Sequence, residues 1–153
     1  MITQEQQKKD EFYMRRALDE AKAAYDEGEI PIGAIVVCKD RILSRAHNLT
    51  ETLCDVTAHA EMQVFTAASS YLGAKYLKDC TLYVTLQPCP MCAGAAYWTQ
   101  LGRIVYGTED QKHAHIDREA VYHPKTKVEG GLLREECASL LQRFFTERRN
   151  NNE

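Results

Sequence analysis

The sequence has 153 residues, of which 44% are hydrophobic and 27% are charged, and this balance is typical of a single globular domain over residues 1–153. The formal net charge of −3 excludes a globally basic nucleic-acid binder, although a local basic patch can still bind RNA. No apolar run approaches the roughly 18 residues of a membrane span, and the polar N-terminus is not a secretory signal, so we expect a cytoplasmic protein that does not enter a membrane.

The first half of the chain predicts a helix, a hairpin of two strands and a second helix. An apolar stripe that begins at Phe12 marks the first helix, and Gly28 is a plausible stop. Lys39 and Asp40 make the turn of the hairpin, because the residues on both sides are typical of strands. In chain order, we expect a helix over the first 25 or so residues, strands over residues 32–38 and 41–47, a loop over residues 48–57 and a helix over residues 58–71.

The second half predicts strands that alternate with helices. Pro88 and Pro90 end a strand that is dense in β-forming residues, and an apolar helix follows them. In chain order, we expect a strand over residues 80–86, a helix over residues 91–98, a strand over residues 103–107, a polar segment over residues 108–125, a weak fifth strand over residues 127–129 and a helix over residues 132–149.

This order of elements predicts an α/β fold. Helices between strands imply parallel crossovers with helices on both faces of a sheet. The opening hairpin adds an antiparallel edge. We therefore expect a three-layer α/β/α sandwich around a mixed five-stranded sheet.

Six cysteines in a chain without a secretory signal are expected to be thiols or metal ligands rather than disulfides. Four are scattered singly among apolar neighbours, and the simplest interpretation makes them small core residues. These four are Cys38, Cys54, Cys80 and Cys137. Cys89 and Cys92 are the one spaced pair.

Two short segments, residues 57–61 and 86–92, carry the residues of a metal site, and each begins a predicted helix at the same edge of the sheet. Cys89 and Cys92 are three residues apart and share a helix face, at a helix start that favours thiolates. Two thiolates and the imidazole of His59 would hold zinc and leave its fourth position open, which is the pattern of catalytic zinc.

Glu61 follows His59 at a spacing that constrains the backbone. Residues two apart in a helix point roughly 200° apart, so His59 and Glu61 can serve one site only if His59 lies at the very start of the helix. Glu61 could then take a proton from the attacking water and deliver it to a ring nitrogen and to the leaving ammonia. The order H-x-E followed by P-C-x-x-C is the signature of zinc deaminases, in which the glutamate is not a ligand.

Other interpretations of these residues stay open. The C-x-x-C pair could be a redox disulfide, although no thioredoxin-like pattern surrounds it. A structural zinc would need a fourth cysteine or histidine, and the remaining cysteines lie in strands or distant helices. A single histidine is more often structural than catalytic.

On these motifs the chain resembles the cytidine deaminase superfamily and, within it, the bacterial tRNA adenosine deaminases. The likeness runs over roughly residues 12–149. It rests on GEIPIGAIVV (28–37), Asn48, TAHAE (57–61), LYVTLQPCPMCAGA (82–95), LGRIVYG (101–107) and ECASLLQRFF (136–145). The sequence after PMC is also similar to that of guanine deaminases, which act on a free base.

The resemblance implies a cytidine deaminase-like fold, Zn²⁺ on His59, Cys89 and Cys92, and Glu61 as proton shuttle. It implies a homodimer that converts adenosine to inosine at wobble position 34 of tRNA, with the target base splayed out of its stack. By position, Asn48 would contact the base or its ribose, Ile32 would line the base pocket, and Ala60 would offer a backbone N–H. The residues that would hold the nucleotide backbone or the anticodon loop are Asp110, Lys112, Phe145, Arg148 and Arg149.

Two departures from the family pattern leave alternatives open. Gln87 stands where the family usually has glutamate, and residues 111–124 are shorter than the tRNA deaminase loop. Three histidines in or near that loop, His113, His115 and His123, are expected to be solvated. The alternatives are a deaminase of free guanine or another small nucleobase, and a zinc-stabilised binding module without enzymatic activity.

Overall fold

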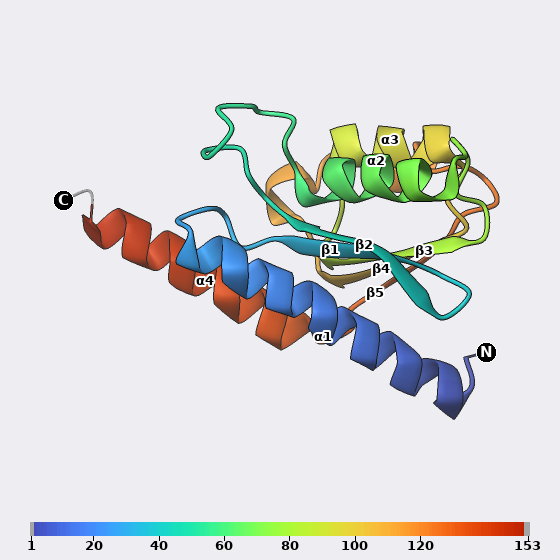
Figure 1. Cartoon of the computed structure of the whole chain (residues 1–153). Coiled ribbons are helices and arrows are strands. Elements are labelled where there is room, and N and C mark those ends of the chain that lie inside the picture. Colours follow the sequence, from blue (N-terminus) through green and yellow to red (C-terminus); the bar gives the residue numbers. More distant parts are fainter. Residues whose placement is uncertain (1, 152–153) are drawn as a thin grey trace.

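The computed structural model describes residues 2–151, which fold around one sheet (Figure 1). The helices are α1 (Gln4–Asp26), α2 (Ala60–Leu72), α3 (Pro90–Thr99) and α4 (Arg134–Asn151). The strands are β1 (Gly33–Cys38), β2 (Arg41–His47), β3 (Cys80–Leu86), β4 (Arg103–Thr108) and β5 (Lys127–Gly130). Two short 3-10 helices, Gln111–His113 and Arg118–Ala120, lie in the predicted polar segment. None of the helices in residues 2–151 combines the length and the apolar character of a membrane span.

The strand order is β2-β1-β3-β4-β5. β1 is antiparallel to both β2 and β3, whereas β4 is parallel to β3 and to β5. β2 and β3 therefore run in the same direction on either side of β1, and α2 is their parallel crossover. With α2 and α3 on one face of the sheet and α1 and α4 on the other (Figure 1), the predicted three-layer sandwich with a mixed sheet is confirmed.

The predicted turns also have the expected backbone. Gly28 follows α1 with φ of 79°, a left-handed conformation in which glycine meets no steric cost. Lys39 and Asp40 join β1 to β2 with φ of 50° and 64°. Two consecutive left-handed residues make the two-residue hairpin turn whose twist matches that of the flanking strands.

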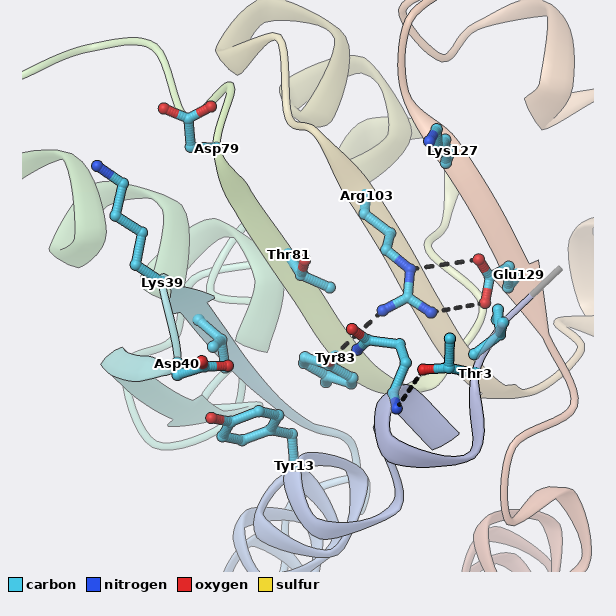
Figure 2. Close-up of a pocket in the computed structure, with 13 residues that line it drawn as sticks. Thr3, Tyr13, Lys39, Asp40, Asp79, Thr81, Tyr83, Arg103, Lys127 and Glu129 are labelled. Carbon is cyan, nitrogen blue, oxygen red and sulfur yellow. Dashed lines mark hydrogen bonds and ion pairs between the residues drawn. The ribbon is translucent and has the colours of Figure 1, made fainter. Parts of the chain in front are cut away.

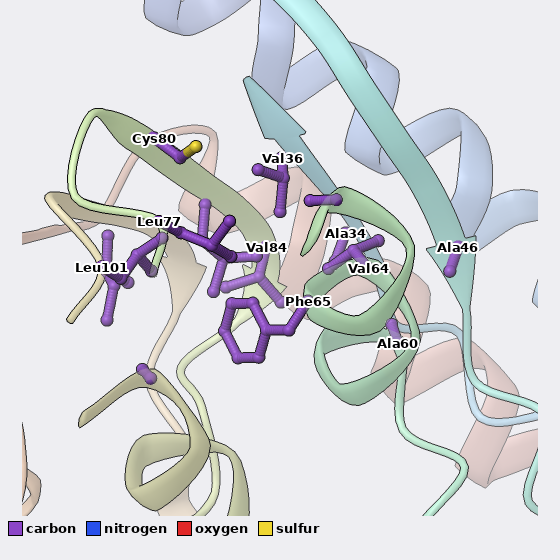
Figure 3. Close-up of a cluster of buried hydrophobic side chains, with 14 of the residues drawn as sticks. Ala34, Val36, Ala46, Ala60, Val64, Phe65, Leu77, Cys80, Val84 and Leu101 are labelled. Atoms are coloured by element: carbon purple, nitrogen blue, oxygen red, sulfur yellow. The ribbon is translucent and has the colours of Figure 1, made fainter. Parts of the chain in front are cut away.

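The pleat divides the sheet side chains between two cores. On the α2 and α3 face, Val36 and Val84 pack against Val64 and Phe65 (Figure 3). On the α1 face, the alternate residues Ile35 and Tyr83 pack against α1. The two sets alternate along β1 and β3, as period-2 burial requires.

Three expectations about burial need correction. Phe12 is 52% exposed, because the buried stripe of α1 passes through Tyr13 and Met14 instead and leaves Phe12 at its edge. Cys54 is exposed in the loop after β2, and Cys38 at the end of β1 is only half-buried. Cys80 and Cys137 are buried as expected.

A polar cavity of about 470 Å³ lies at the end of the sheet where β3, β4 and β5 begin (Figure 2). Its Arg103 is already engaged, because this side chain donates to both carboxylate oxygens of Asp10 and of Glu129. Asp10 also accepts a hydrogen bond of 2.6 Å from the Tyr83 hydroxyl. These groups tie α1 to the sheet at the end opposite His59, Cys89 and Cys92, so the cavity is remote from the predicted metal site.

We expect Gly33→Ala to destabilise the fold, because a Cβ at Gly33 would overlap the backbone of Ala17 and Ala21 in α1. Forcing α1 away from β1 should lower the free energy of unfolding by roughly 1–3 kcal/mol, measured by urea titration. Gly94→Ala is the matched control, since a Cβ there meets nothing within 4 Å and alanine favours a helix. Equal midpoints for the two variants would contradict the close packing at Gly33.

Candidate metal centre

The ends of two helices place the three predicted ligands. His59 is the N-cap of α2, with φ of −73° and ψ of 152°, and Cys89 is the N-cap of α3, with φ of −69° and ψ of 171°. Both residues are therefore extended, and neither side chain caps its own helix. Cys92 lies one turn into α3. The expectation that His59 stands at the very start of its helix is confirmed.

The three side chains converge on one point. Within residues 2–151, one group of three or more histidine, cysteine or acidic residues could hold a metal ion, and it consists of His59, Cys89 and Cys92. Their ligand atoms all lie within 4.8 Å of one another. Nδ1 of His59 is 3.5 Å from Sγ of Cys89 and 3.5 Å from Sγ of Cys92. Tetrahedral zinc, with bonds of about 2.3 Å to sulfur and about 2.0 Å to nitrogen, sets ligand atoms roughly 3.5 Å apart. The cluster fits zinc.

The two sulfurs differ in their affinity for a proton. Hydrogen bonding from Cys92, helped by His59, lowers the pKa of Cys89 to about 4. The pKa of Cys92 is raised, because its thiol is hydrogen-bonded to Cys89 and is buried beside Glu61. The pair therefore holds one proton between two sulfurs, and a divalent cation that binds both sulfurs must displace it.

Glu61 lies in the first turn of α2 and is 4% exposed. Burial raises the pKa of its carboxyl group to about 7, and the negative charge of Cys89 adds to that effect. An acid that titrates near neutral pH beside a metal cluster can both take up and release a proton.

The loop between β2 and α2, which leads into His59, is anchored by a buried carboxylate. Glu29, 0% exposed, accepts hydrogen bonds from the backbone N–H groups of Glu51 and Thr52, at 3.1 and 2.6 Å, and from the Thr52 hydroxyl. This role of Glu29 was not predicted, although an acidic residue just before a buried strand was a visible signal.

Three of the predicted substrate contacts lie near the start of α2. Asn48 is 4% exposed, and its backbone N–H donates to the carbonyl of Ile32 at 3.1 Å. Ile32 is half-buried and packs against the core that contains Ala60. Ala60 is the first residue of α2, so its backbone N–H has no carbonyl partner within the helix. Their contacts with substrate stay predictions.

The predicted nucleotide-backbone residues lie in the loop after β4, in different surroundings. Asp110 is 7% exposed, and its carboxylate accepts hydrogen bonds from His113 at 2.7 Å and from Arg118 at 3.2 Å. Arg118 and the Asp110 backbone N–H both donate to the side-chain carbonyl of Gln87, each at 3.0 Å. Asp110 thus braces the loop against the segment that carries Cys89, whereas Lys112 is exposed.

Three histidines in the loop after β4 were expected to be solvated, and this holds for one of them. His115 is exposed, but His113 is bonded to Asp110, and the ring of His123 lies 5.8 Å from that of Tyr97. Arg118, 6% exposed, was missed altogether, because an arginine in a polar segment gives no sign of burial.

Phe145, Arg148 and Arg149 lie near the C-terminal end of α4, on the sheet face opposite α2 and α3 (Figure 1). Phe145 is 42% exposed. Arg148 donates to the Gly28 carbonyl at 2.8 Å, and Arg149 to the Thr146 hydroxyl at 3.3 Å. These residues are not part of the metal cluster, and their contact with an anticodon stays a prediction.

We expect Arg118→Met to loosen the loop after β4, because Asp110 and Gln87 each lose a buried hydrogen bond from a charged donor. A local loss of roughly 2 kcal/mol corresponds to about 30-fold faster amide hydrogen exchange over residues 109–122. Arg134→Met is the matched control, since Arg134 pairs with Glu109 at the surface, where a salt bridge contributes little. Equal exchange rates in the two variants would contradict the bracing role of Arg118.

Comparison with known proteins shows which proteins this chain resembles. The model of the MafB19-like deaminase family matches residues 8–149. A tRNA-specific adenosine deaminase of Bacillus subtilis is 44% identical over 146 residues, which cover 92% of this chain and 91% of that protein. A solved structure from a study of A-to-I editing by tRNA:A34 deaminases at the wobble position superposes with a TM-score of 0.79 at 39% identity, covering 85% of this chain and 99% of that one.

A guanine deaminase of Bacillus subtilis is also similar in structure. Its TM-score is 0.63 at 34% identity, and the match covers 80% of this chain and 72% of that chain. This fold is therefore common to tRNA:A34 deaminases and guanine deaminases, which are named for different bases.

Proposed function

This chain belongs to the MafB19-like deaminase family, and we propose that it is a zinc-dependent hydrolase that converts adenosine to inosine at wobble position 34 of tRNA. One observation carries the proposal: a metal-ligand cluster and a buried carboxyl group meet at two helix starts, in a chain 44% identical to a tRNA-specific adenosine deaminase. We propose one catalytic domain over residues 1–153, and the single sheet within residues 2–151 supports this.

His59, Cys89 and Cys92 would hold the zinc, since their separations match tetrahedral ligands. Zinc with three protein ligands supplies an open position for water and makes that water far more acidic than bulk water.

Glu61 would move the protons. Its carboxylate takes a proton from the water that attacks C6 of the adenine, and gives a proton to the ring nitrogen N1. The bond from C6 to the amino nitrogen then breaks, and ammonia leaves with a proton that Glu61 relays. Water and adenosine become inosine and ammonia. A pKa of about 7 suits a group that must both accept and donate within one turnover.

The substrate would be held by groups from three parts of the chain: the start of α2, the loop after β4 and the C-terminal end of α4. Asn48, Ile32 and Ala60, which lie around the start of α2, would contact the base and its ribose. The residues that we propose contact the rest of the anticodon loop are Asp110, Lys112, Phe145, Arg148 and Arg149. Asp110 would act through the loop that it braces, because its carboxylate is already bonded to His113 and Arg118.

The test is a substrate panel on the zinc-loaded protein. We expect inosine in an anticodon stem-loop that carries adenosine at position 34, and none when that adenosine stands at another position of the loop. Ammonia release from free adenine, guanine and cytosine and from their nucleosides should be slower by orders of magnitude. An active protein that leaves the stem-loop unchanged would overturn the tRNA assignment.

Deamination of free guanine is the second candidate function, and the guanine deaminase match at 34% identity supports it. Its marker is ammonia release from guanine at a rate that added tRNA does not change. Inosine formation in the stem-loop without release from guanine would exclude it.

We propose a homodimer whose interface includes the outer face of α3. Trp98 is 76% exposed and Tyr97 is 40% exposed, and two large aromatic side chains on one exposed turn are typical of an interface. Sedimentation should give a dimer for the wild type and a monomer for Trp98→Glu.

We also propose a cytoplasmic location, because six free cysteines suit a reducing compartment.

A further inference from the structure

Two thiols outside the metal centre face each other at the far end of the sheet. Cys38 is the last residue of β1 and Cys80 is the first residue of β3, and they are direct partners in the antiparallel register. Both side chains lie on the α2 and α3 face, where Cys80 joins the core and Cys38 packs against its margin. Figure 3 shows the Cys80 sulfur there, on the strand next to that of Val36.

The backbone around Cys80 identifies the type of cross-strand pair. Its N–H donates to the Leu77 carbonyl at 3.1 Å rather than to β1. Its carbonyl points toward the side of β4, since a Cβ built at Gly102 would lie 3.1 Å from that oxygen. Cys38 and Cys80 are therefore a non-hydrogen-bonded pair, whose Cα atoms lie about 4.5 Å apart. Disulfides span Cα separations of about 4.4–6.8 Å, so the two sulfurs can bond without moving either strand.

We propose that Cys38 and Cys80 are a reversible oxidation site, which a low-molecular-weight disulfide such as oxidised glutathione converts to an intramolecular disulfide. The pair is not better interpreted as a metal site. Within residues 2–151, the one group of three or more possible metal ligands is His59, Cys89 and Cys92, so Cys38 and Cys80 belong to no such group. Cytosolic disulfides are typically transient and redox-sensing, which agrees with a pair that is free in the reduced protein.

The order of the two steps follows from exposure. Cys38 is half-buried and within reach of solvent, so its thiolate attacks one sulfur of the oxidant, forms a mixed disulfide and expels one glutathione thiolate. Cys80 is 2% exposed, and burial next to Cys38 raises its pKa to about 12. Its thiol loses a proton, attacks the Cys38 sulfur and expels the second glutathione. Two protein thiols lose two electrons, oxidised glutathione gains them, and the two thiol protons end on two glutathione molecules.

The test treats the zinc-loaded, full-length protein with oxidised glutathione and follows intact mass and peptide maps. We expect a species that has lost two hydrogen atoms, a peptide pair linked through Cys38 and Cys80, and full reversal by dithiothreitol. Cys54→Ser is the matched control, because Cys54 is exposed and has no cysteine partner across a strand, and this variant should form the same link.

Cys38→Ser should form no linked pair involving Cys80. The wild-type peptide map decides the question even if that variant folds poorly. The proposal is overturned if Cys38 and Cys80 stay reduced, or carry only glutathione, under conditions that fully modify Cys54. It is equally overturned if the link joins other cysteines.

Discussion

Glu61→Gln should abolish deamination while zinc stays bound. Glutamine has the size of the protonated acid, so the helix start and the ligand cluster keep their shape, but an amide cannot pass a proton. Loss of a general acid and base costs roughly 10²–10⁴-fold in rate. We expect a single-turnover rate of inosine formation lower by about 10³-fold, with an unchanged zinc content by elemental analysis.

Glu135→Gln is the control for this variant, since Glu135 is an exposed residue in the first turn of α4. It should retain the wild-type rate. If Glu61→Gln kept more than a tenth of the wild-type rate, Glu61 would not be the proton shuttle. If no property of the protein changed in Glu61→Gln, the interpretation as a non-enzymatic zinc-stabilised module would be favoured.

Cys92→Ser should lose both zinc and activity. Cys92 is 0% exposed, and its Sγ lies 3.5 Å from Nδ1 of His59. A neutral hydroxyl is a poor replacement for a thiolate, and removal of groups that merely support zinc ligands already costs 10–100-fold in affinity. We expect zinc affinity to fall by more than about 100-fold, measured by competition with a chelator.

Cys54→Ser is the matched control, since Cys54 is exposed on the loop that precedes His59. This variant should keep one zinc per chain and full activity. Equal zinc affinity in Cys92→Ser and Cys54→Ser would remove Cys92 from the ligand set. Chelator treatment of the wild type should abolish activity, and added zinc should restore it.

Local sequence patterns were sufficient to predict the helices and strands. Residues 80–86 and 41–47 were predicted as strands and form β3 and β2 with the same bounds, because β-forming residues and alternation act over a few positions. Prolines end β3 and begin α3, where a missing N–H costs nothing. Helix periodicity placed α1 correctly but misplaced Phe12, since the width of a buried stripe depends on what covers it.

Long-range contacts escaped prediction. Asp110 was expected to face the substrate, but Arg118 and Gln87 engage it in a buried network. Nothing near Arg118 in the sequence indicates that partnership, because its partners are 8 and 31 residues away. The pairing of Cys38 with Cys80 escaped for the same reason, since the two residues lie far apart in the chain.

The candidate metal ligands could be predicted from the sequence by itself, because the residue types at two helix starts are local information. The strands and helices that hold these residues are predicted from local information too. The tertiary structure alone decided that these helix starts bring Nδ1 and two sulfurs within 4.8 Å of one another. It also decided that Cys38 on β1 faces Cys80 on the adjacent strand β3. Register between distant strands is set by packing of the whole sheet, and a one-residue slip would turn every side chain to the opposite face.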